Sequence, residues 1–363
     1  MTFSVVGARL VRGVASAIAL ASMLTGCSAA EENATPTPVA FKACMVATAA
    51  GFNDGGFNQL AYFGLQQAMV EYGPSISVLA TQSDNVYSVT SAAKKLVSRG
   101  CNLVIANGVK AYSALLPLAD GNPTLHFVAL GYNSNVGSME PSPINKNLTA
   151  IAFDGRSAFL QAGYLAAAAS STGRVGVIGA SGNPVVQTEI WYFRQGVLQY
   201  SQRTGKSVSL FGAQQPDYAS WDLVPAYTSA SLLKGKARAI IDSGADVIFP
   251  VGINGLPVAQ VAAEKGVKVV GSDSEWVSQA RYATVKSAVL ASVVKNVASE
   301  VAVAVAVLIP GNPDPGALAS SPTVSIGETD GERWPDGAAE AMNSLAADYL
   351  AGKSTVIDEA QRY

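Results

Sequence analysis

The sequence predicts an α/β protein of two lobes, each a doubly wound, mostly parallel sheet flanked by helices. Short apolar runs alternate with helical stretches at the spacing of βαβ units. Each run is continuously apolar, which is typical of strands that helices cover on both faces. The alternation closes near residue 154 and then restarts, so we expect two similar halves that face each other across a cleft.

The first lobe is expected over residues 41–154, together with about 278–320 from later in the chain. Its predicted strands are 44–48, 76–80, 101–106, 126–130 and 148–153. Its predicted helices are 58–72, 86–98 and 111–119. Because each strand is followed by a helix, the strands of this lobe are expected to be parallel.

The second lobe is expected over residues 155–277, together with about 321–363. Its predicted strands are 174–179, 207–211, 246–251 and 268–271, and its helices are 157–170, 186–201, 227–243 and 258–265. The remaining tail is expected to form a helix over 288–308, a strand over 323–326 and a helix over 336–351. The lobe to which this tail belongs is left open.

The first 40 residues have the pattern of an export signal and a tether. Arg9 and Arg12 precede an apolar run, 14–24, that is too short to span a bilayer. The segment 1–26 ends in Leu-Thr-Gly before Cys27, which resembles a lipobox, so we expect Cys27 to be lipidated. Small polar residues and prolines over 27–40 indicate a flexible tether. The protein is thus expected at the extracytoplasmic face of the cell membrane.

Composition excludes several classes of function. The chain is 49% hydrophobic and 14% charged, and its net charge of −2 becomes −4 once Arg9 and Arg12 are removed. No cluster of Lys and Arg exists, so nucleic acid is not an expected partner. His126 is the only histidine and no CxxC motif occurs, so neither a metal site nor a cofactor is expected. Cys44 and Cys101 are open to two interpretations, a disulfide or two buried thiols.

The glycine-rich stretch 51–68 is the first candidate ligand site. It follows a predicted strand and leads into a helix, which is where open α/β sheets bind small molecules. Phe57 offers a flat apolar face, and Asn58 offers both a donor and an acceptor. These side chains suit a flat heterocycle with polar edges, although a capped helix with a core phenylalanine fits the same pattern.

Three further candidates follow strands of the second lobe. Asp273 follows 268–271, where a carboxylate can accept hydrogen bonds from two adjacent hydroxyls. Gly252 follows 246–251 and permits close backbone approach. Trp221 is either a second flat wall of the site or packed against its own lobe. No nucleophile elbow, P-loop or GxGxxG fingerprint is present, so an enzyme is not expected.

The stretches 51–65, 159–180 and 244–276, in this order and spacing, resemble the BMP (basic membrane protein) family of lipoproteins. The resemblance extends over nearly all of residues 41–310. It implies a type I periplasmic-binding-protein fold and a substrate-binding protein of an ABC importer, in a family of which several members bind purine nucleosides.

The resemblance also implies roles for individual residues. Phe57 matches the residue that stacks on the base, and Asn58 the one that bonds its edge. Trp221 falls near a second stacking aromatic. At the sugar, the resemblance implies three residues: Gly252, Asp273 and Lys295.

Two acidic residues that the family usually carries are missing. Ala49-Ala50 stands where one follows the first strand, and Gly131 where another follows the fourth. The base edge is then read differently, or the ligand is not a typical purine nucleoside. The substitutes that we consider for the base edge are Asp54, Asn107 and Asn133.

The sequence therefore predicts a monomeric, lipid-anchored receptor that delivers a nucleoside-like solute to an ABC permease. One alternative keeps the fold and binds a free sugar or another small polar metabolite. The other is a ligand-sensing surface lipoprotein without a transport role.

Overall fold

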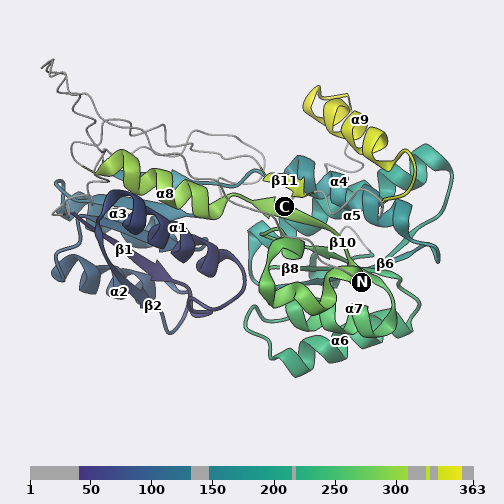
Figure 1. The fold of residues 1–363 in the computed structure, drawn as a ribbon, viewed down its shortest axis with the longest axis horizontal. Coiled ribbons are helices and arrows are strands. Elements are labelled where there is room, and N and C mark those ends of the chain that lie inside the picture. Colours follow the sequence, from purple (N-terminus) through teal and green to yellow (C-terminus); the bar gives the residue numbers. More distant parts are fainter. Residues whose placement is uncertain (1–40, 132–146, 215–217, 310–323, 328–333, 354–363) are drawn as a thin grey trace, which may run out of the picture. The chain divides into compact units, whose positions relative to one another are not determined.

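Two sheets carry the fold in a computed structural model of the protein (Figure 1). The structure describes residues 41–131, 147–214, 218–309, 324–327 and 334–353. The predicted signal peptide 1–26, Cys27 with the tether over 27–40, and Asn133 lie outside these residues. Nothing in the structure bears on those predictions.

The first lobe is a five-stranded sheet in the order β2-β1-β3-β4-β5, in which every neighbouring pair is parallel. Its core lies on both faces of the sheet, because α1 and α8 cover one face and α2 and α3 cover the other. The strands are β1 (Lys42–Ala47), β2 (Ser75–Ala80), β3 (Leu103–Asn107), β4 (His126–Leu130) and β5 (Leu148–Ile151). The helices are α1 (Phe57–Tyr72), α2 (Val86–Ser98), α3 (Ala111–Gly121) and α8 (Val297–Leu308).

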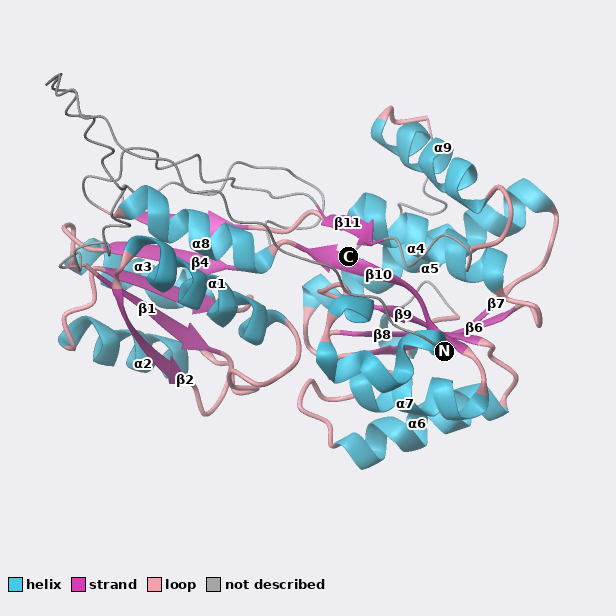
Figure 2. Cartoon of the chain, in the orientation of Figure 1, coloured by secondary structure: helices cyan, strands magenta, loops and turns pink. Residues whose placement is uncertain are grey.

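The second lobe is a six-stranded sheet in the order β11-β10-β9-β8-β6-β7, parallel except for the β10–β11 pair (Figure 2). Helices α4, α5 and α9 pack on one face, and α6 and α7 on the other. The strands are β6 (Arg174–Gly179), β7 (Ser209–Phe211), β8 (Val247–Val251), β9 (Lys268–Gly271), β10 (Val289–Lys295) and β11 (Val324–Gly327). The α-helices are α4 (Arg156–Ala169), α5 (Pro184–Thr204), α6 (Ala230–Asp242), α7 (Leu256–Lys265) and α9 (Ala338–Leu350). The 3₁₀ helices are η1 (Tyr218–Ser220), η2 (Trp276–Ser278) and η3 (Ala280–Ala288).

The predicted helix over 288–308 is wrong in its first part. Residues 289–295 form strand β10, which pairs in parallel with β9 and antiparallel with β11. The helix α8 begins only at Val297. The strand sequence, VLASVVK, is a short apolar run with β-branched residues, and such runs fit a strand or a buried helix equally well until pairing decides between them.

The boundary between the lobes differs accordingly from the predicted one. We expected 278–320 to join the first lobe, but η3 packs with α7, and β10 is hydrogen-bonded within the second sheet. The chain returns to the first lobe only with α8, which packs on α1. The two helices approach so closely that a Cβ at Gly64 would lie 2.1 Å from the carbonyl oxygen of Ala298. Helix α9 packs in the second lobe, through Ala338, Met342 and Leu345.

The structure places a disulfide between Cys44 and Cys101, the first of the two interpretations. Cys44 lies in β1, and Cys101 lies just before β3, the strand that pairs with β1. The two Cα atoms are 6.0 Å apart, and both residues are buried. The bond therefore closes a long loop on a single face of the first sheet.

Candidate functional site

Asp54 secures the start of α1, the helix that carries Phe57 and Asn58. Its Oδ1 accepts the backbone N–H groups of Gly56 at 2.9 Å and Gln59 at 3.0 Å. Its Oδ2 accepts the backbone N–H of Asn58 at 3.1 Å. The negative charge of Asp54 also interacts favourably with the positive end of the helix dipole. Both oxygens of Asp54 are thus engaged in the helix start, and a ligand contact through Asp54 stays a prediction.

The side-chain amide of Asn58 has a fixed orientation. Its Oδ1 accepts the backbone N–H of Thr48 at 3.1 Å, and its Nδ2 donates to the Thr48 hydroxyl and to Asp54 Oδ2. Because an N–H only donates and a carboxylate only accepts, the amide oxygen and nitrogen cannot be exchanged. Asn107 Nδ2 donates to the same Oδ1 at 3.0 Å, so Asn58 has two donors on its oxygen and two acceptors on its nitrogen. A ligand that bonds to Asn58 must therefore replace one of these partners.

Asn107 retains an acceptor that Asn58 does not. Its side chain is buried at the carboxyl end of β3, and its Nδ2 faces Asn58. Its Oδ1 is buried and receives no hydrogen bond from the described residues. A buried acceptor without a donor costs about 1–3 kcal/mol, so this oxygen is a good place for a ligand N–H or O–H.

The ring of Phe57 lies against the end of β4. It makes an edge-to-face contact with Phe153, with ring centroids 5.5 Å apart. A Cβ at Gly131 would lie 3.2 Å from Phe57 Cζ, and Gly131 has a φ of +81°. Any side chain at this position would be strained and would press on the ring. This packing and the positive φ favour glycine at position 131.

At Ala49-Ala50, the other position where an acidic residue is missing, Asp84 supplies a carboxylate from the end of the neighbouring strand. The backbone N–H of Ala49 donates to Oδ1 of Asp84 at 2.8 Å. Asp84 follows β2, the strand that pairs with β1, so its carboxylate is brought to the same edge of the sheet. Asp84 was not predicted from the sequence, because its contact with Ala49 depends on the pairing of β1 with β2.

The second lobe brings three ionisable side chains together. Lys295 Nζ, at the end of β10, donates to Asp273 Oδ1 at 2.7 Å and to Glu189 Oε1 at 2.5 Å. The three side chains are largely buried, with side-chain exposures of 7% for Lys295 and Glu189 and 14% for Asp273. The structure therefore unites the predicted residues Asp273 and Lys295, and it adds Glu189 from α5.

The backbone of Asp273 is held in an unusual conformation. Its φ is +68°, and among the described residues no other non-glycine has a positive φ in this region. The carbonyl oxygen of Asp273 accepts the backbone N–H of Lys295 at 3.0 Å, which fixes the turn after β9. Such conformations cost about 1–3 kcal/mol and are concentrated at functional sites.

Burial and the neighbouring charges shift the pKa values of Glu189 and Lys295. Burial raises the pKa of Glu189, and the charge of Asp273 adds to the rise, although the Lys295 ammonium opposes it. Burial disfavours the ammonium of Lys295, but Asp273 and Glu189 outweigh this effect and raise the pKa of Lys295 above its ordinary value. Lys295 is therefore charged at neutral pH.

Gly252 and Trp221 pack within the second lobe. Gly252 has a φ of +68°, and a Cβ there would lie 2.3 Å from a methyl carbon of Val186. Trp221 is 6% exposed, and its ring contacts that of Tyr218 with centroids 4.7 Å apart. Of the two interpretations of Trp221, the structure shows packing against its own lobe. Ligand contacts of either residue stay predictions.

Residues of the two lobes meet near the start of α1. A Cβ at Gly56, next to Phe57, would lie 3.7 Å from Asp273 Oδ2. Arg281 of η3 donates from Nη1 to Gln59 Oε1 at 3.3 Å and from Nη2 to Asn254 Oδ1 at 3.4 Å. The carboxyl ends of the two sheets thus bring the stacking candidate and the carboxylate candidate together.

Glu189 and Arg281 were not predicted from the sequence. Glu189 stands directly before the apolar run Ile190–Phe193 on a helix face that packs into the core. A carboxylate in such a place is rarely buried without a partner, and that signal was available in the sequence. Arg281 carried no local signal, because its contacts are with residues far away in the chain.

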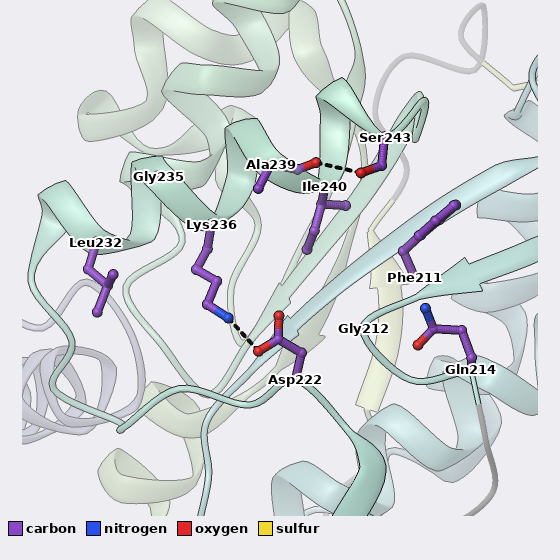
Figure 3. A pocket seen from close by; sticks show the side chains of 10 residues that line it. All are labelled: Phe211, Gly212, Gln214, Asp222, Leu232, Gly235, Lys236, Ala239, Ile240 and Ser243. Carbon is purple, nitrogen blue, oxygen red and sulfur yellow. Dashed lines mark hydrogen bonds and ion pairs between the residues drawn. The ribbon is translucent and has the colours of Figure 1, made fainter.

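A hollow of about 480 Å³ lies elsewhere, between β7 and α6 of the second lobe (Figure 3). An ion pair between Lys236 and Asp222 lines it, and none of the predicted ligand residues does. Among the described residues, no group of three or more His, Cys, Asp or Glu side chains could hold a metal ion. No helix among the residues that the structure describes is both long and apolar enough to cross a membrane.

Solved structures confirm the predicted fold class. A solute-binding protein of an ABC transporter system from Aeropyrum pernix superposes with a TM-score of 0.68, at 16% identity over 88% of this chain and 94% of that one. A transcriptional activator of the comK gene from Bacillus halodurans superposes with a TM-score of 0.62, at 18% identity over 86% and 99%. The fold is thus of the periplasmic-binding-protein type, and since a regulator shares it, the fold alone does not assign the function.

Sequence comparison is more specific. The ABC transporter nucleoside-binding protein BmpA of Lactococcus lactis is 30% identical over 243 residues, which are 64% of this chain and 62% of that protein. The matched part therefore spans less than two thirds of this relative. The family Bmp, described as ABC transporter substrate-binding protein PnrA-like, matches residues 41–212 and 222–315, most of the chain. The protein therefore belongs to this family.

Proposed function

We propose that the protein is an extracytoplasmic lipoprotein that binds a nucleoside-like molecule between its lobes and delivers it to an ABC permease. The family membership supports a transport role, and the L. lactis relative is named for nucleoside binding. Among the described residues, no group of three or more His, Cys, Asp or Glu side chains is placed to hold a metal ion as the ligand instead.

One observation carries the ligand proposal. Asp273 is held in a left-handed conformation and bonded to Lys295 through Oδ1, while its Oδ2 lies beside Gly56, the neighbour of Phe57. A carboxylate oxygen near the start of the helix that carries Phe57 suits a ligand that joins a flat base to a sugar. In this proposal Phe57 stacks on the base and Asp273 accepts hydrogen bonds from sugar hydroxyls.

We assign the base edge to Asn107 first. Its buried Oδ1 lacks a donor from the described residues, and a base N–H would supply one. Asn58 then acts mainly by fixing the Asn107 amide, because its own amide groups already have partners. In this proposal Gly252 contacts the sugar and Trp221 contacts the base.

A free sugar is the second candidate. It is favoured by the first lobe, where Asp54 is engaged in the helix start and glycine stands at position 131. A base would then have to bind without an uncommitted carboxylate from the first lobe. A sugar needs only Asp273, the carboxylate of the second lobe. A sensing lipoprotein without transport is the third candidate, and the same fold in a regulator is compatible with it.

A thermal-unfolding panel of nucleosides, free bases and pentoses on the purified protein tests the ligand. A ligand at a hundred times its dissociation constant adds about 2.7 kcal/mol to the free energy of unfolding. We expect nucleosides to raise the melting temperature more than free bases or pentoses. A shift with ribose but none with any nucleoside would replace the first candidate by the second.

Anchoring, oligomeric state and delivery need separate experiments. We expect lipid on Cys27, such as palmitate, in membrane-fractionated protein, and its loss in Cys27→Ala. We expect a monomer by light scattering. Uptake of a labelled nucleoside by cells with and without this gene tests transport; equal uptake would favour a sensing role.

A further inference from the structure

Glu189 is a buried carboxylate that the proposed site does not yet use. It lies on α5, 106 residues before Lys295 in the chain, and its residue exposure is 5%. Burying two carboxylates for one ammonium is costly, because the desolvation of the second negative charge is not fully offset. A neutral side chain at this position would avoid that cost, so the second carboxylate needs another explanation.

The hydrogen bonds of the group are incomplete on the carboxylate side. Lys295 uses one N–H for each carboxylate, on Oε1 of Glu189 and Oδ1 of Asp273. The other oxygens, Glu189 Oε2 and Asp273 Oδ2, receive no hydrogen bond from the described residues. The side chains of Glu189 and Asp273 keep 7% and 14% of their surface exposed. Two acceptors and one remaining ammonium N–H are therefore left for a ligand.

Hydroxyl groups fit this set of atoms and phosphate does not. A hydroxyl both donates and accepts, so it satisfies a carboxylate oxygen and the third N–H of Lys295 together. A phosphate dianion only accepts, so it leaves both carboxylate oxygens unpaired. It also adds a charge of about −1.5 to −2 beside a group whose own net charge is −1.

We propose that Glu189 is a second ligand-facing carboxylate, which accepts a hydroxyl of the bound molecule and excludes phosphorylated ligands. The proposal rests on the proposed function in one respect: it places the polyhydroxyl end of the ligand at Asp273. Its ligand class is an unphosphorylated nucleoside or sugar with at least two hydroxyl donors at this end.

Glu189→Gln is the informative variant. Its amide oxygen still accepts from Lys295, and its NH₂ replaces an acceptor by a donor where the ligand hydroxyl lies. The net charge of residue 189, Asp273 and Lys295 together then becomes zero. Glu264→Gln is the matched control, because Glu264 pairs with Arg238 at the surface of the same lobe.

The experiment is calorimetric titration of the purified wild-type protein and both variants with adenosine, ribose and their 5′-phosphates, and with 2′-, 3′- and 5′-deoxyadenosine. We expect the wild type to prefer each neutral ligand over its phosphate by about a hundredfold or more, as for sites with a built hydrogen-bonding group. We expect Glu189→Gln to reduce that ratio at least about tenfold, and Glu264→Gln to leave it unchanged.

The deoxy series separates direct contact from a structural role. If Glu189 contacts the ligand, one deoxyadenosine binds more weakly than adenosine to the wild type and about equally to Glu189→Gln. A Glu189→Gln protein that keeps both the phosphate ratio and the deoxy profile overturns the proposal. If Glu189→Gln does not fold, Glu189→Asp keeps the charge, so phosphate exclusion must persist while the deoxy profile changes. Failure of the wild type to bind either neutral probe refutes the proposed function itself.

Discussion

Arg281 Nη1 lies 3.3 Å from Gln59 Oε1, although 222 residues separate them and they belong to different lobes. The guanidinium also lies 5.4 Å from the ring centroid of Tyr282, which stacks on Trp276. Gln59 Oε1 in turn accepts the backbone N–H of Gly55. The turn before Phe57 therefore contacts the second lobe through one arginine.

Two glycines of that turn provide a matched pair of variants. Gly51 and Gly55 have φ angles of +70° and +71°, but nothing lies within 4 Å of a Cβ at Gly51, whereas one at Gly55 would lie 1.6 Å from Arg281 Nη1. Gly51→Ala should cost about 1–2 kcal/mol of unfolding free energy, for the left-handed backbone alone. Gly55→Ala should cost the same plus the loss of the displaced arginine contacts, about 1 kcal/mol or less, because the guanidinium is at the end of a flexible chain.

Arg281→Ala isolates the contact in a double-mutant cycle, measured by urea unfolding. In the Arg281→Ala background, Gly55→Ala should cost only as much as Gly51→Ala. An equal cost of Gly55→Ala with and without the arginine would show that the two side chains are not coupled.

Phe57→Ala should weaken nucleoside binding by about 10- to 100-fold, since a stacked base contributes about 1–3 kcal/mol. Phe63→Ala is the control on the same helix: Phe63 is 49% exposed, and affinity should be unchanged. Calorimetric titration with adenosine measures both. Equal affinities of wild type and Phe57→Ala would remove Phe57 from the ligand site and leave it as a packing partner of Phe153.

Much of the fold was accessible from the sequence, because parallel strands covered on both faces read as short apolar runs between helices. The strand ends that carry Asn107 and Asp273 were predictable for the same reason, since strand ends in such sheets define the ligand edge. The strand β10 was not predictable from its own residues. Its state is decided by pairing with β9 and β11, which local periodicity does not contain.

Predictions for individual site residues failed where the contacts depend on residues that are distant in the sequence. The sequence indicated that Asn58 offers a donor and an acceptor, but the structure engages both with Thr48, Asp54 and Asn107. Glu189 gains its significance only from Lys295, which lies 106 residues later. Residue type and spacing therefore located the edge of the site, and tertiary contacts decide which atoms remain for a ligand.

The raised pKa of Glu189 predicts a pH dependence of stability. Burial raises this pKa, and Asp273 adds to it against the opposing effect of Lys295, whose own raised pKa keeps it charged. Between the ordinary glutamate pKa and the raised one, the folded protein holds a proton that the unfolded chain has lost. The free energy of unfolding should therefore fall as pH rises through that window, by at most about 1.4 kcal/mol per pH unit.

Urea unfolding of the wild type and Glu189→Gln from pH 4 to 8 measures this effect as a difference. The stability of the wild type relative to the variant should decrease as pH rises, since glutamine does not titrate. A difference that is constant with pH, or that grows, would show that Glu189 ionises in the folded protein as it does in the unfolded chain.

The disulfide should stabilise the first lobe mainly through the unfolded chain. Cys44 and Cys101 are separated by 57 residues, and closing a loop of that length lowers the unfolded-state entropy by the equivalent of about 4 kcal/mol at 25 °C. Cys44→Ala/Cys101→Ala removes one buried sulfur atom at each position, so the variant reports chiefly on the cross-link and adds a small cavity cost. We expect the double variant to lose about 3–4 kcal/mol in urea unfolding, with a larger m-value because its denatured chain is less constrained. The reduced wild-type protein is the control and should match the variant. Equal stability of the oxidised protein and the double variant would contradict the loop-closure argument.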